Sequence, residues 1–471
     1  MLRIAYLTMG LRRGRGGPRL ICGFARSLRN AKPDWKVHLF SLEGTTESPT
    51  DGAAEMSLSE GEATYLPVGC TKTDCDAGNS IWQVVQVSLQ KAMVYGFATP
   101  MAPLDVMFGM FTPESFLSDP YTTRTLLEDL CDSHDILHLG AWTGMYTSAL
   151  SLLRKRHKCM GSAIVCHAIV HPAAGTSSLA NYFGRRLSKR LIDLIRVPAL
   201  RDTLRGMDAV TVSTPWEFHL LRRLGMKSVS WVGEGIDLDY VSGLVGRLRA
   251  RSLEASPDEG SILFIGPKCY TKGYYHLLFA FRELVRRNNG LVLRVIGSWT
   301  LENNRIARRL QLQAWGIEEE LRAKGLVRTY RDVSEFAKYL LISKSNIMVL
   351  PSAAETIPLV FLEAWALKKP VIGPSIPTVG SIIRYPGDGG LLVDFGDVVG
   401  IRDAIAKLLE DTDFSRSAGR IGYQKVETAY NLRMVARRLI DTYAALEDPK
   451  ANHSNQTQMS LQRIPGRIGE D

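Results

Sequence analysis

Two successive series of short β-rich runs, each run followed by a helical pattern, constrain the fold of this chain more than any other feature. The first series has runs at residues 4–8, 36–40, 135–139, 162–167, 209–213 and 229–233. The second has runs at residues 261–266, 291–297, 326–330, 346–352 and 370–373. Strands that alternate with helices are typical of βαβ units and parallel sheets. The chain is therefore predicted to be an α/β protein of two Rossmann-like, doubly wound parallel-sheet domains.

A polar stretch without a strong hydrophobic period, residues 241–260, separates the two series and is expected to be a linker. It leaves an N-terminal domain at residues 1–240 and a C-terminal domain at residues 261–428. An amphipathic helix at residues 429–446 is expected to pack back on the N-terminal domain, and the polar tail, residues 447–471, to be disordered. Doubly wound sheets bind ligands at the carboxyl ends of their strands, so the two domains are expected to face each other across a ligand-binding cleft.

The composition is that of an ordinary globular protein, because 45% of the 471 residues are hydrophobic and 23% are charged. No apolar run reaches the length of a membrane-spanning helix, and the N-terminal residues lack a secretory pattern. We therefore expect a cytoplasmic protein.

The formal net charge of +10 predicts an attraction to anions, which include nucleic acid, acidic lipid and phosphorylated small molecules. The chain has no nucleic-acid-reading motif and no basic stretch interleaved with aromatic residues, so we expect no nucleic-acid partner. Basic residues are frequent at residues 11–19 and 184–206, and in the latter stretch leucines recur at helical spacing. Such a stretch is either a peripheral contact with anionic lipid at the inner face of a membrane or a solvated face above an ordinary core.

Seven cysteines are dispersed along the chain and none forms a C-x-x-C pair, so we expect reduced thiols and neither a disulfide framework nor a zinc site. Two D-x-D strings, at residues 237–239 and 411–413, are interpreted as chance matches to a metal-binding motif. No metal is expected.

A glycine-rich turn follows the first predicted strand. Gly16 and Gly17 precede a predicted helix at residues 18–30, where backbone N–H groups can approach a phosphate. The stretch lacks the G-x-G-x-x-G spacing of dinucleotide-binding proteins and the G-K-[ST] of a P-loop, so both classes are disfavoured. Glycines that serve the turn geometry alone are the alternative.

Two lysines follow the first strand of the second series, in "FIGPKCYTKGYYHLLFAF". Lys268 lies in the loop, and Lys272 stands with Gly273 at the start of the next helix. Ammonium groups near a helix N-terminus suit a diphosphate. The alternative is a pair of solvated loop lysines.

Two glutamates separated by seven residues, Glu355 and Glu363, stand in "PSAAETIPLVFLEAWALKKPVIG" after another predicted strand. Pro358 suits the first turn of a helix, which places Glu355 before the helix and Glu363 within it. One interpretation is structural: Glu355 favours the helix dipole, and Glu363 is a paired helix residue. The other gives each carboxylate a ligand hydroxyl and gives the N–H groups of residues 356–359 a phosphate.

Together these motifs resemble those of the family-4 glycosyltransferases, which are enzymes of the GT-B fold. The most specific element is the E-x7-E motif of Glu355 and Glu363; supporting matches are "GGPR", "VSTPWEFHLLRRLG", "GID", "KGYYHLLFAF" and "YNLRMVARRLIDTYAAL". The similarity extends from residue 1 to about residue 446. It implies a GT-B fold and a retaining, metal-independent transfer of a hexose-type sugar from a nucleotide-diphosphate sugar, without a cofactor. The implied acceptor is a glycan, a lipid or a polyprenyl-linked molecule.

The resemblance also implies roles for individual residues. Glu355 would contact the donor sugar near the reacting centre, Lys272 would hold the donor diphosphate, and His167 would help to position the sugar as the third catalytic residue. The implied donor-binding residues are Glu363, on the nucleotide ribose, together with Lys268, Thr356, Ile357, Leu359, Gly16 and Gly17.

Two positions depart from the family pattern. Pro267 stands where the family usually has an arginine that shares the phosphate charge, so Lys268 would have to replace it with a point charge in place of a bidentate fork. Glu234 stands where the family usually has an asparagine. The alternatives to a transferase are a noncatalytic subunit that binds nucleotide sugars and, with fewer acids and bases to support it, a sugar-nucleotide epimerase.

Overall fold

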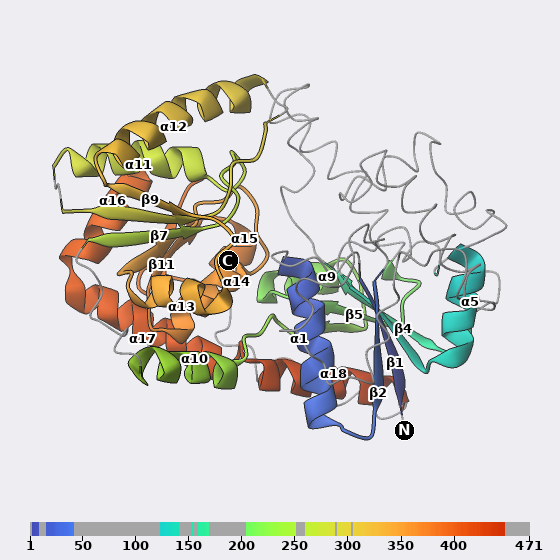
Figure 1. Ribbon diagram of the computed structural model, residues 1–471. Coiled ribbons are helices and arrows are strands. Elements are labelled where there is room, and N and C mark those ends of the chain that lie inside the picture. Colours follow the sequence, from blue (N-terminus) through green and yellow to red (C-terminus); the bar gives the residue numbers. More distant parts are fainter. Residues whose placement is uncertain are drawn as a thin grey trace, which may run out of the picture. The chain divides into compact units, whose positions relative to one another are not determined.

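A computed structural model of the chain describes residues 2–8, 16–41, 123–140, 150, 153–154, 159–168, 204–250, 260–287, 290–302 and 305–447. The chain divides into two compact units, which are described separately (Figure 1). Unit 1 comprises residues 1–170, 174–232 and 435–471, and unit 2 comprises residues 171–173 and 233–434. Within the described residues, each unit contains one six-stranded sheet.

The sheet of unit 1 has the strand order β2-β1-β3-β4-β5-β6, with parallel pairing between neighbours. Its strands are β1 (Arg3–Thr8), β2 (Lys36–Ser41), β3 (Ile136–Leu139), β4 (Ala163–Ala168), β5 (Ala209–Val212) and β6 (Val229–Trp231). The described helices between them are α1 (Gly16–Ala31), α5 (Thr123–Ser133) and α9 (Pro215–Arg223). Strands β3 and β5 are buried along their whole length, as expected of parallel strands that are covered on both faces.

The C-terminal helix α18 (Leu432–Glu447) begins in unit 2 and from Val435 belongs to unit 1. Val435, Leu439 and Tyr443 recur at helical spacing and therefore share one face of the helix. This face packs in the core of unit 1 together with Ile4 and Tyr6 of β1. The first strand of the chain thus depends for its burial on the last helix.

The sheet of unit 2 has the order β12-β11-β10-β7-β8-β9, again with parallel pairing. Its strands are β7 (Ser261–Ile265), β8 (Val292–Ile296), β9 (Val327–Tyr330), β10 (Ile347–Val349), β11 (Val371–Pro374) and β12 (Gly390–Val393). The chain continues from β9 to β10 on the other side of β7. The carboxyl ends of β7 and β10 therefore flank the topological switch point, where doubly wound sheets bind their ligands.

Helices cover both faces of this sheet. They are α10 (Leu238–Ala250), α11 (Tyr274–Val285), α12 (Arg305–Ala323), α13 (Glu335–Ser343), α14 (Leu359–Ala366), α15 (Pro377–Gly380), α16 (Val398–Glu410) and α17 (Thr412–Thr428). Helices α11 and α12 lie side by side over one face, and α13, α14 and α17 lie over the other (Figure 1). The apolar residues of α11 that recur at helical spacing are all buried.

The expected linker is partly helical. Residues 241–250 continue helix α10, whereas the sequence predicted an irregular connection over residues 241–260. The reason is a buried stripe of Val241, Leu244 and Leu248, which recur at the spacing of one helix face. The polar residues between them conceal this period.

Two helix starts also differ from the prediction. Gly16 and Gly17 are the first residues of α1 instead of a turn in front of it. The first helical turn has no intrahelical partners for its N–H groups, so glycine is tolerated there. Pro358 is the N-cap of α14 with an extended backbone, and the helix itself begins at Leu359.

Two of the predicted features lie wholly or largely outside the described residues. These are the basic stretch at residues 184–206 and the tail after residue 447. Within the part of the chain that the structure describes, no helix combines the length and apolar character that a membrane span requires.

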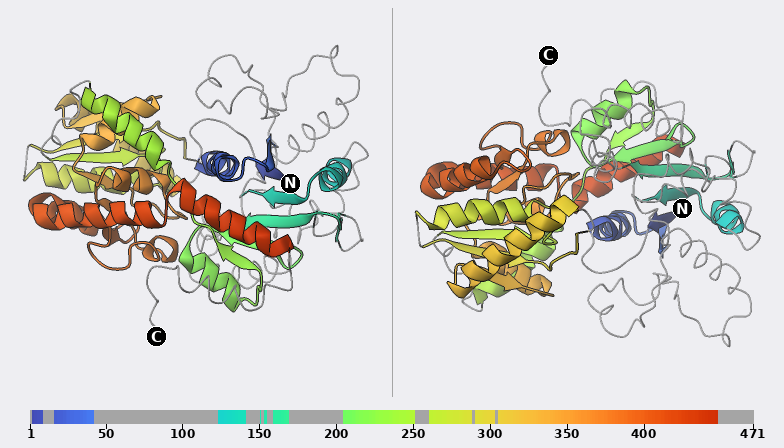
Figure 2. Two further views of the ribbon diagram at one scale, coloured as in Figure 1. Left: turned by 90° about the horizontal axis from the view of Figure 1, so that it is seen from below. Right: turned by 90° about the horizontal axis from the view of Figure 1, so that it is seen from above.

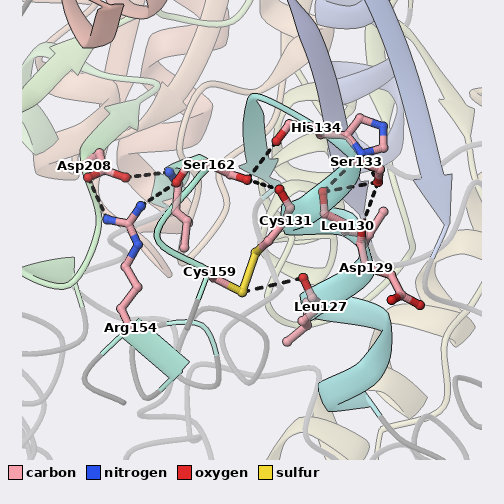
Figure 3. The surroundings of a disulfide bond; sticks show 11 residues. Leu127, Asp129, Leu130, Cys131, Ser133, His134, Arg154, Cys159, Ser162 and Asp208 are labelled. Atoms are coloured by element: carbon pink, nitrogen blue, oxygen red, sulfur yellow. Dashed lines mark hydrogen bonds and ion pairs between the residues drawn. A yellow bond between two sulfur atoms is a disulfide. The ribbon is translucent and has the colours of Figure 1, made fainter. Parts of the chain in front are cut away.

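Cys131 and Cys159 form a disulfide bond in unit 1 (Figure 3). Cys131 lies in α5, and Cys159 precedes β4 with a separation of 28 residues along the chain. Beside the bond, Ser162 Oγ donates to the backbone carbonyl of His134 at 2.7 Å and ties the start of β4 to the end of α5. The prediction of reduced thiols is wrong for this pair, because its two cysteines come together only when α5 packs beside the sheet.

Candidate functional site

The loops at the carboxyl ends of β7 and β10 touch each other in unit 2. Gly273 has a φ of 71°, and a Cβ atom at this position would lie 2.1 Å from the carbonyl oxygen of Pro351. Only glycine combines this left-handed backbone with such a close approach. The contact holds Lys272, the preceding residue, beside the loop that carries Glu355.

Lys272 and Glu355 form an ion pair at the centre of the candidate site. Lys272 Nζ lies 2.6 Å from Glu355 Oε1, and Ser352 Oγ donates to the same oxygen at 2.8 Å. Thr378 Oγ1, from the helix after β11, donates to the backbone carbonyl of Glu355 at 2.5 Å. We call these four residues the Lys272 cluster. It is built from segments that follow three neighbouring strands.

The Lys272 cluster keeps access to solvent. The side chain of Lys272 is 32% exposed and that of Glu355 is 12% exposed. Burial lowers the pKa of Lys272, but the charge of Glu355 and its hydrogen bond outweigh this effect and raise the pKa above the ordinary lysine value. Lys272 is therefore a fixed cation at neutral pH that can accept an anionic ligand.

The predicted phosphate-binding segment after Glu355 lies in front of α14. Thr356 and Ile357 precede the helix, and Leu359 is its first residue. Thr356 Oγ1 donates to Glu234 Oε1 at 3.2 Å, which connects this segment to one of the two positions that depart from the family pattern. A carboxylate at residue 234 places a negative charge beside a segment that was expected to bind a phosphate.

Glu363 lies within α14, as predicted, but its carboxylate is buried. Glu363 Oε1 lies 2.7 Å from Nζ of Lys338, which is also buried and belongs to α13. Lys338 Nζ also contacts Glu335 Oε1 at 2.7 Å. The carboxylate expected to hold a ribose is thus engaged by a lysine of the neighbouring helix.

Lys268 does not take the place of the arginine missing at Pro267. Its Nζ lies 2.7 Å from Glu318 Oε1 of α12, both side chains are buried, and the ammonium lies over the rings of Tyr274 and Trp299. A carboxylate such as Glu318 is buried only with a partner of opposite charge. This pair anchors α12 to the loop after β7, and we leave Lys268 out of the candidate site.

His167 belongs to a buried network in unit 1. Its Nδ1 lies 3.0 Å from Thr211 Oγ1 and its Nε2 lies 3.0 Å from Ser213 Oγ, and the residue is only 1% exposed. Thr211 Oγ1 lies 3.2 Å from His138 Nε2, and His138 Nδ1 lies 2.6 Å from the hydroxyl of Tyr443. We call these residues the histidine network; it connects β3, β4 and β5 to helix α18.

The histidines of this network are neutral at pH 7. Burial lowers the pKa of His167 to about 4, and burial together with the neighbouring His167 holds the pKa of His138 well below the ordinary value. Both ring nitrogens of His167 meet hydroxyl groups, and the ring has almost no exposed surface. In this structure His167 is an interior residue whose two ring nitrogens both have hydroxyl partners.

No group of three or more histidine, cysteine, aspartate or glutamate side chains in the described ranges is placed to hold a metal ion. The aspartates of the two D-x-D strings have other partners. Asp239 pairs with Arg433, and Asp411 caps α17 by accepting from the N–H of Phe414 at 3.0 Å.

Sequence reasoning missed Ser352, Thr378 and Lys338. Ser352 shortly follows β10, and Thr378 lies in the helix just after β11, so the rule that ligands bind at strand ends offered a signal for both. Lys338 carried no signal, because its contact with Glu363 arises from the packing of two helices.

Two units with doubly wound parallel sheets, one of them with a polar cluster at its strand ends, define a protein of the GT-B fold. The solved structure of sucrose-phosphate synthase from Thermosynechococcus elongatus matches with a TM-score of 0.63 at 18% sequence identity. The match covers 95% of this chain and 99% of that chain. This likeness establishes the fold.

The segment at residues 249–425 matches the family described as glycosyl transferases group 1. The chain is 32% identical over 111 residues to N-acetyl-alpha-D-glucosaminyl L-malate synthase of Bacillus anthracis, over 23% of this chain and 29% of that protein. It is 26% identical over 191 residues to the capsular polysaccharide biosynthesis glycosyltransferase CapM of Staphylococcus aureus, over 40% of this chain and 46% of that protein. The chain thus spans less than half the length of these curated relatives. The predicted resemblance is confirmed at the level of the group 1 family.

Proposed function

We propose that the chain is a glycosyltransferase that moves a hexose-type sugar from a nucleotide-diphosphate sugar to a glycan, lipid or polyprenyl-linked acceptor. The observation that carries the proposal is the Lys272 cluster, at the carboxyl ends of β7 and β10 within a segment of the group 1 family. The name of one relative, a capsular polysaccharide biosynthesis glycosyltransferase, supports a glycan acceptor.

Lys272 supplies the fixed positive charge that the donor diphosphate requires. As the bond to the sugar breaks, negative charge develops on the leaving phosphate, and a preorganised cation stabilises it. When the diphosphate replaces Glu355 as the partner of the Lys272 ammonium, Glu355 becomes available to accept a hydrogen bond from a hydroxyl of the donor sugar. The backbone N–H groups of Thr356, Ile357 and Leu359 supply further donors to the phosphate.

Glu363 acts on the nucleotide ribose in this proposal. Its carboxylate is paired with Lys338 in the interior, so ribose binding requires this pair to loosen. The ribose does not react, so Glu363 would contact it equally in the ground state and in the transition state. Glu363 would therefore affect the affinity for the donor and not the rate of the chemical step.

Transfer is proposed to retain the anomeric configuration and to need no metal. The leaving phosphate accepts the proton of the acceptor hydroxyl on the same face of the sugar, so no carboxylate has to act as a nucleophile. Glu355 suits a binding role, because Lys272 and Ser352 already hold the same carboxylate oxygen. Lys272 takes the electrostatic role that a divalent ion has in metal-dependent transferases.

The basic residues of the N-terminal half support an acceptor with a lipid or polyprenyl phosphate. We propose that the chain works in the cytoplasm and meets such an acceptor at the inner face of a membrane. Transfer to a purely soluble acceptor, with no gain from added membrane extract, would contradict this part of the proposal.

A panel of nucleotide sugars tests the proposed activity. The purified chain is incubated with each donor, with and without membrane extract, in the presence of excess EDTA. We expect transfer that the chelator leaves unchanged, that Glu355→Gln abolishes and that Glu320→Gln preserves. Glu320 is the matched control, because it is an exposed glutamate of unit 2 that pairs with Lys324, the residue just after the same helix.

A noncatalytic subunit that binds nucleotide sugars is the second candidate. Pro267 replaces a family arginine, Lys268 is consumed by a buried ion pair, and Glu234 brings negative charge to the predicted phosphate loop. Calorimetric binding of a donor without hydrolysis or transfer under any condition would favour this candidate over the enzyme.

A further inference from the structure

Large apolar side chains are exposed along one short stretch of unit 2. Among the described residues, half of the exposed large apolar side chains fall in this stretch: Leu301 (78% exposed), Ile306 (66%), Leu312 (62%) and Trp315 (52%). The last three belong to α12, which lies beside α11 over one face of the sheet of unit 2 (Figures 1 and 2). A concentration of exposed apolar side chains is typical of an interaction surface.

These side chains are not needed to hold α12 in place. The core-facing stripe of the helix is a different set: Ala307, Gln311, Ala314, Ile317, Glu318 and Leu321. Glu318 anchors this stripe, because its carboxylate accepts from Lys268 Nζ at 2.7 Å and from the hydroxyl of Tyr274 at 2.6 Å. The exposed apolar residues on the opposite side therefore require another explanation.

The exposed side of α12 is also basic. Arg305, Arg308 and Arg309 are exposed, and residues 305–317 include no acidic residue. The acidic residues of the helix, Glu318–Glu320, follow in its second half, where each is paired with a basic side chain. We call Arg305, Ile306, Arg308, Arg309, Leu312 and Trp315 the α12 outer face.

Trp315 is held in a fixed orientation on this face. Its ring stacks on Trp299 with a centroid distance of 6.1 Å and an interplanar angle of 26°. Trp299 stacks in turn on Tyr275 at 5.8 Å. Side-chain entropy lost on binding is a cost of association, and an indole that is already ordered loses less.

We propose that the α12 outer face binds the surface of an anionic phospholipid bilayer. Arginines on such a face contact lipid phosphates, tryptophan favours the boundary between head groups and acyl chains, and isoleucine and leucine insert just below it. The proposal is independent of the proposed transferase activity.

Vesicle cosedimentation tests this proposal with the full chain at low ionic strength. The vesicles contain phosphatidylcholine and phosphatidylglycerol in equal parts, or phosphatidylcholine alone. We expect binding to the anionic vesicles only, with the partition coefficient about 25-fold lower in Arg308→Gln/Arg309→Gln, since each arginine contributes roughly fivefold. Leu312→Gln/Trp315→Gln should lower it about tenfold.

Matched variants elsewhere in unit 2 provide the controls. Arg286→Gln/Arg287→Gln removes two exposed arginines of the α11 end, and Tyr385→Gln/Val399→Gln removes two exposed apolar side chains. Both should bind like the wild type, and circular dichroism should confirm that all variants fold.

Three outcomes would overturn the proposal. They are the absence of wild-type binding to anionic vesicles, equal binding by the wild type and the α12 variants, and equal losses in the α12 and control variants. Self-association without vesicles that Leu312→Gln/Trp315→Gln abolishes would assign the face to a second copy of the chain and would overturn it as well.

Discussion

Unit 2 keeps its candidate site charged and partly open, whereas unit 1 encloses a neutral polar network. In the Lys272 cluster, a third of the lysine side chain is exposed and its ammonium meets a single carboxylate. In the histidine network, His167 is 1% exposed and both ring nitrogens meet hydroxyl groups. A partly exposed ion pair can exchange one partner for a ligand at little cost, but a buried network loses stability when any member is left unsatisfied. The difference indicates a binding role for the first and a structural role for the second.

The largest effect is expected from removing the cation of the Lys272 cluster. Lys272→Met should lower the rate of sugar transfer about 1000-fold, because the leaving diphosphate loses its fixed positive charge. The free energy of unfolding should change by less than about 1 kcal/mol, since Glu355 remains accessible to water. Transfer rates and urea unfolding measure the two quantities. As the control, Lys324→Met removes an exposed lysine that pairs with Glu320 and should change neither the transfer rate nor the stability. A large loss of stability with unchanged turnover in Lys272→Met would assign Lys272 a structural role.

The buried ion pair of Lys338 and Glu363 contrasts with the partly exposed pair of the Lys272 cluster. Lys338→Met should lower the free energy of unfolding by about 3 kcal/mol, because it removes the ammonium that donates to the buried carboxylate of Glu363. The double variant Lys338→Met/Glu363→Gln should recover part of this loss, since the buried negative charge is removed as well. Urea unfolding of both variants measures the difference. Equal losses of unfolding free energy in the single and the double variant would show that the buried charge of Glu363 is not the cause of the loss.

A substitution of His167 tests whether the histidine network of unit 1 has a structural role. His167→Leu should destabilise unit 1 by about 2 kcal/mol, because the hydroxyls of Thr211 and Ser213 each lose the hydrogen bond to His167. Turnover per folded molecule should change little. If His167 instead contacts the donor sugar, turnover should fall at least about 100-fold with unchanged stability. Unfolding curves and single-donor kinetics on the same preparation separate the two results.

The sequence predicted the features that depend on neighbouring residues. The strands before Lys272 and Glu355 are apolar runs that end in glycine or proline, so both residues could be placed at strand ends. Features that depend on contacts between residues far apart in the sequence could not be predicted. The partner of Lys268 is Glu318, on a helix far along the chain, and the network of His167 reaches Tyr443 near the end of the described residues. Nothing local distinguishes a buried lysine from a phosphate-binding one until its partner is known.

The pH dependence of stability gives the most specific test of the histidine network. The folded pKa of His167 is about 4 and the ordinary value is 6.5, so between these values the unfolded chain binds a proton that the folded chain does not. The free energy of unfolding should therefore fall as the pH decreases through this window, by about 1.4 kcal/mol per pH unit for this residue. His167→Gln keeps a donor and an acceptor but does not titrate, so its profile should be flatter by this amount. Burial, the larger cause of the lowered pKa of His138, is present in both proteins, so the contribution of His138 changes only through the loss of the smaller effect of His167. Urea unfolding measures both profiles. If the profiles of the wild type and His167→Gln are parallel across the window, His167 has the same pKa in the folded and the unfolded protein, and the prediction is contradicted.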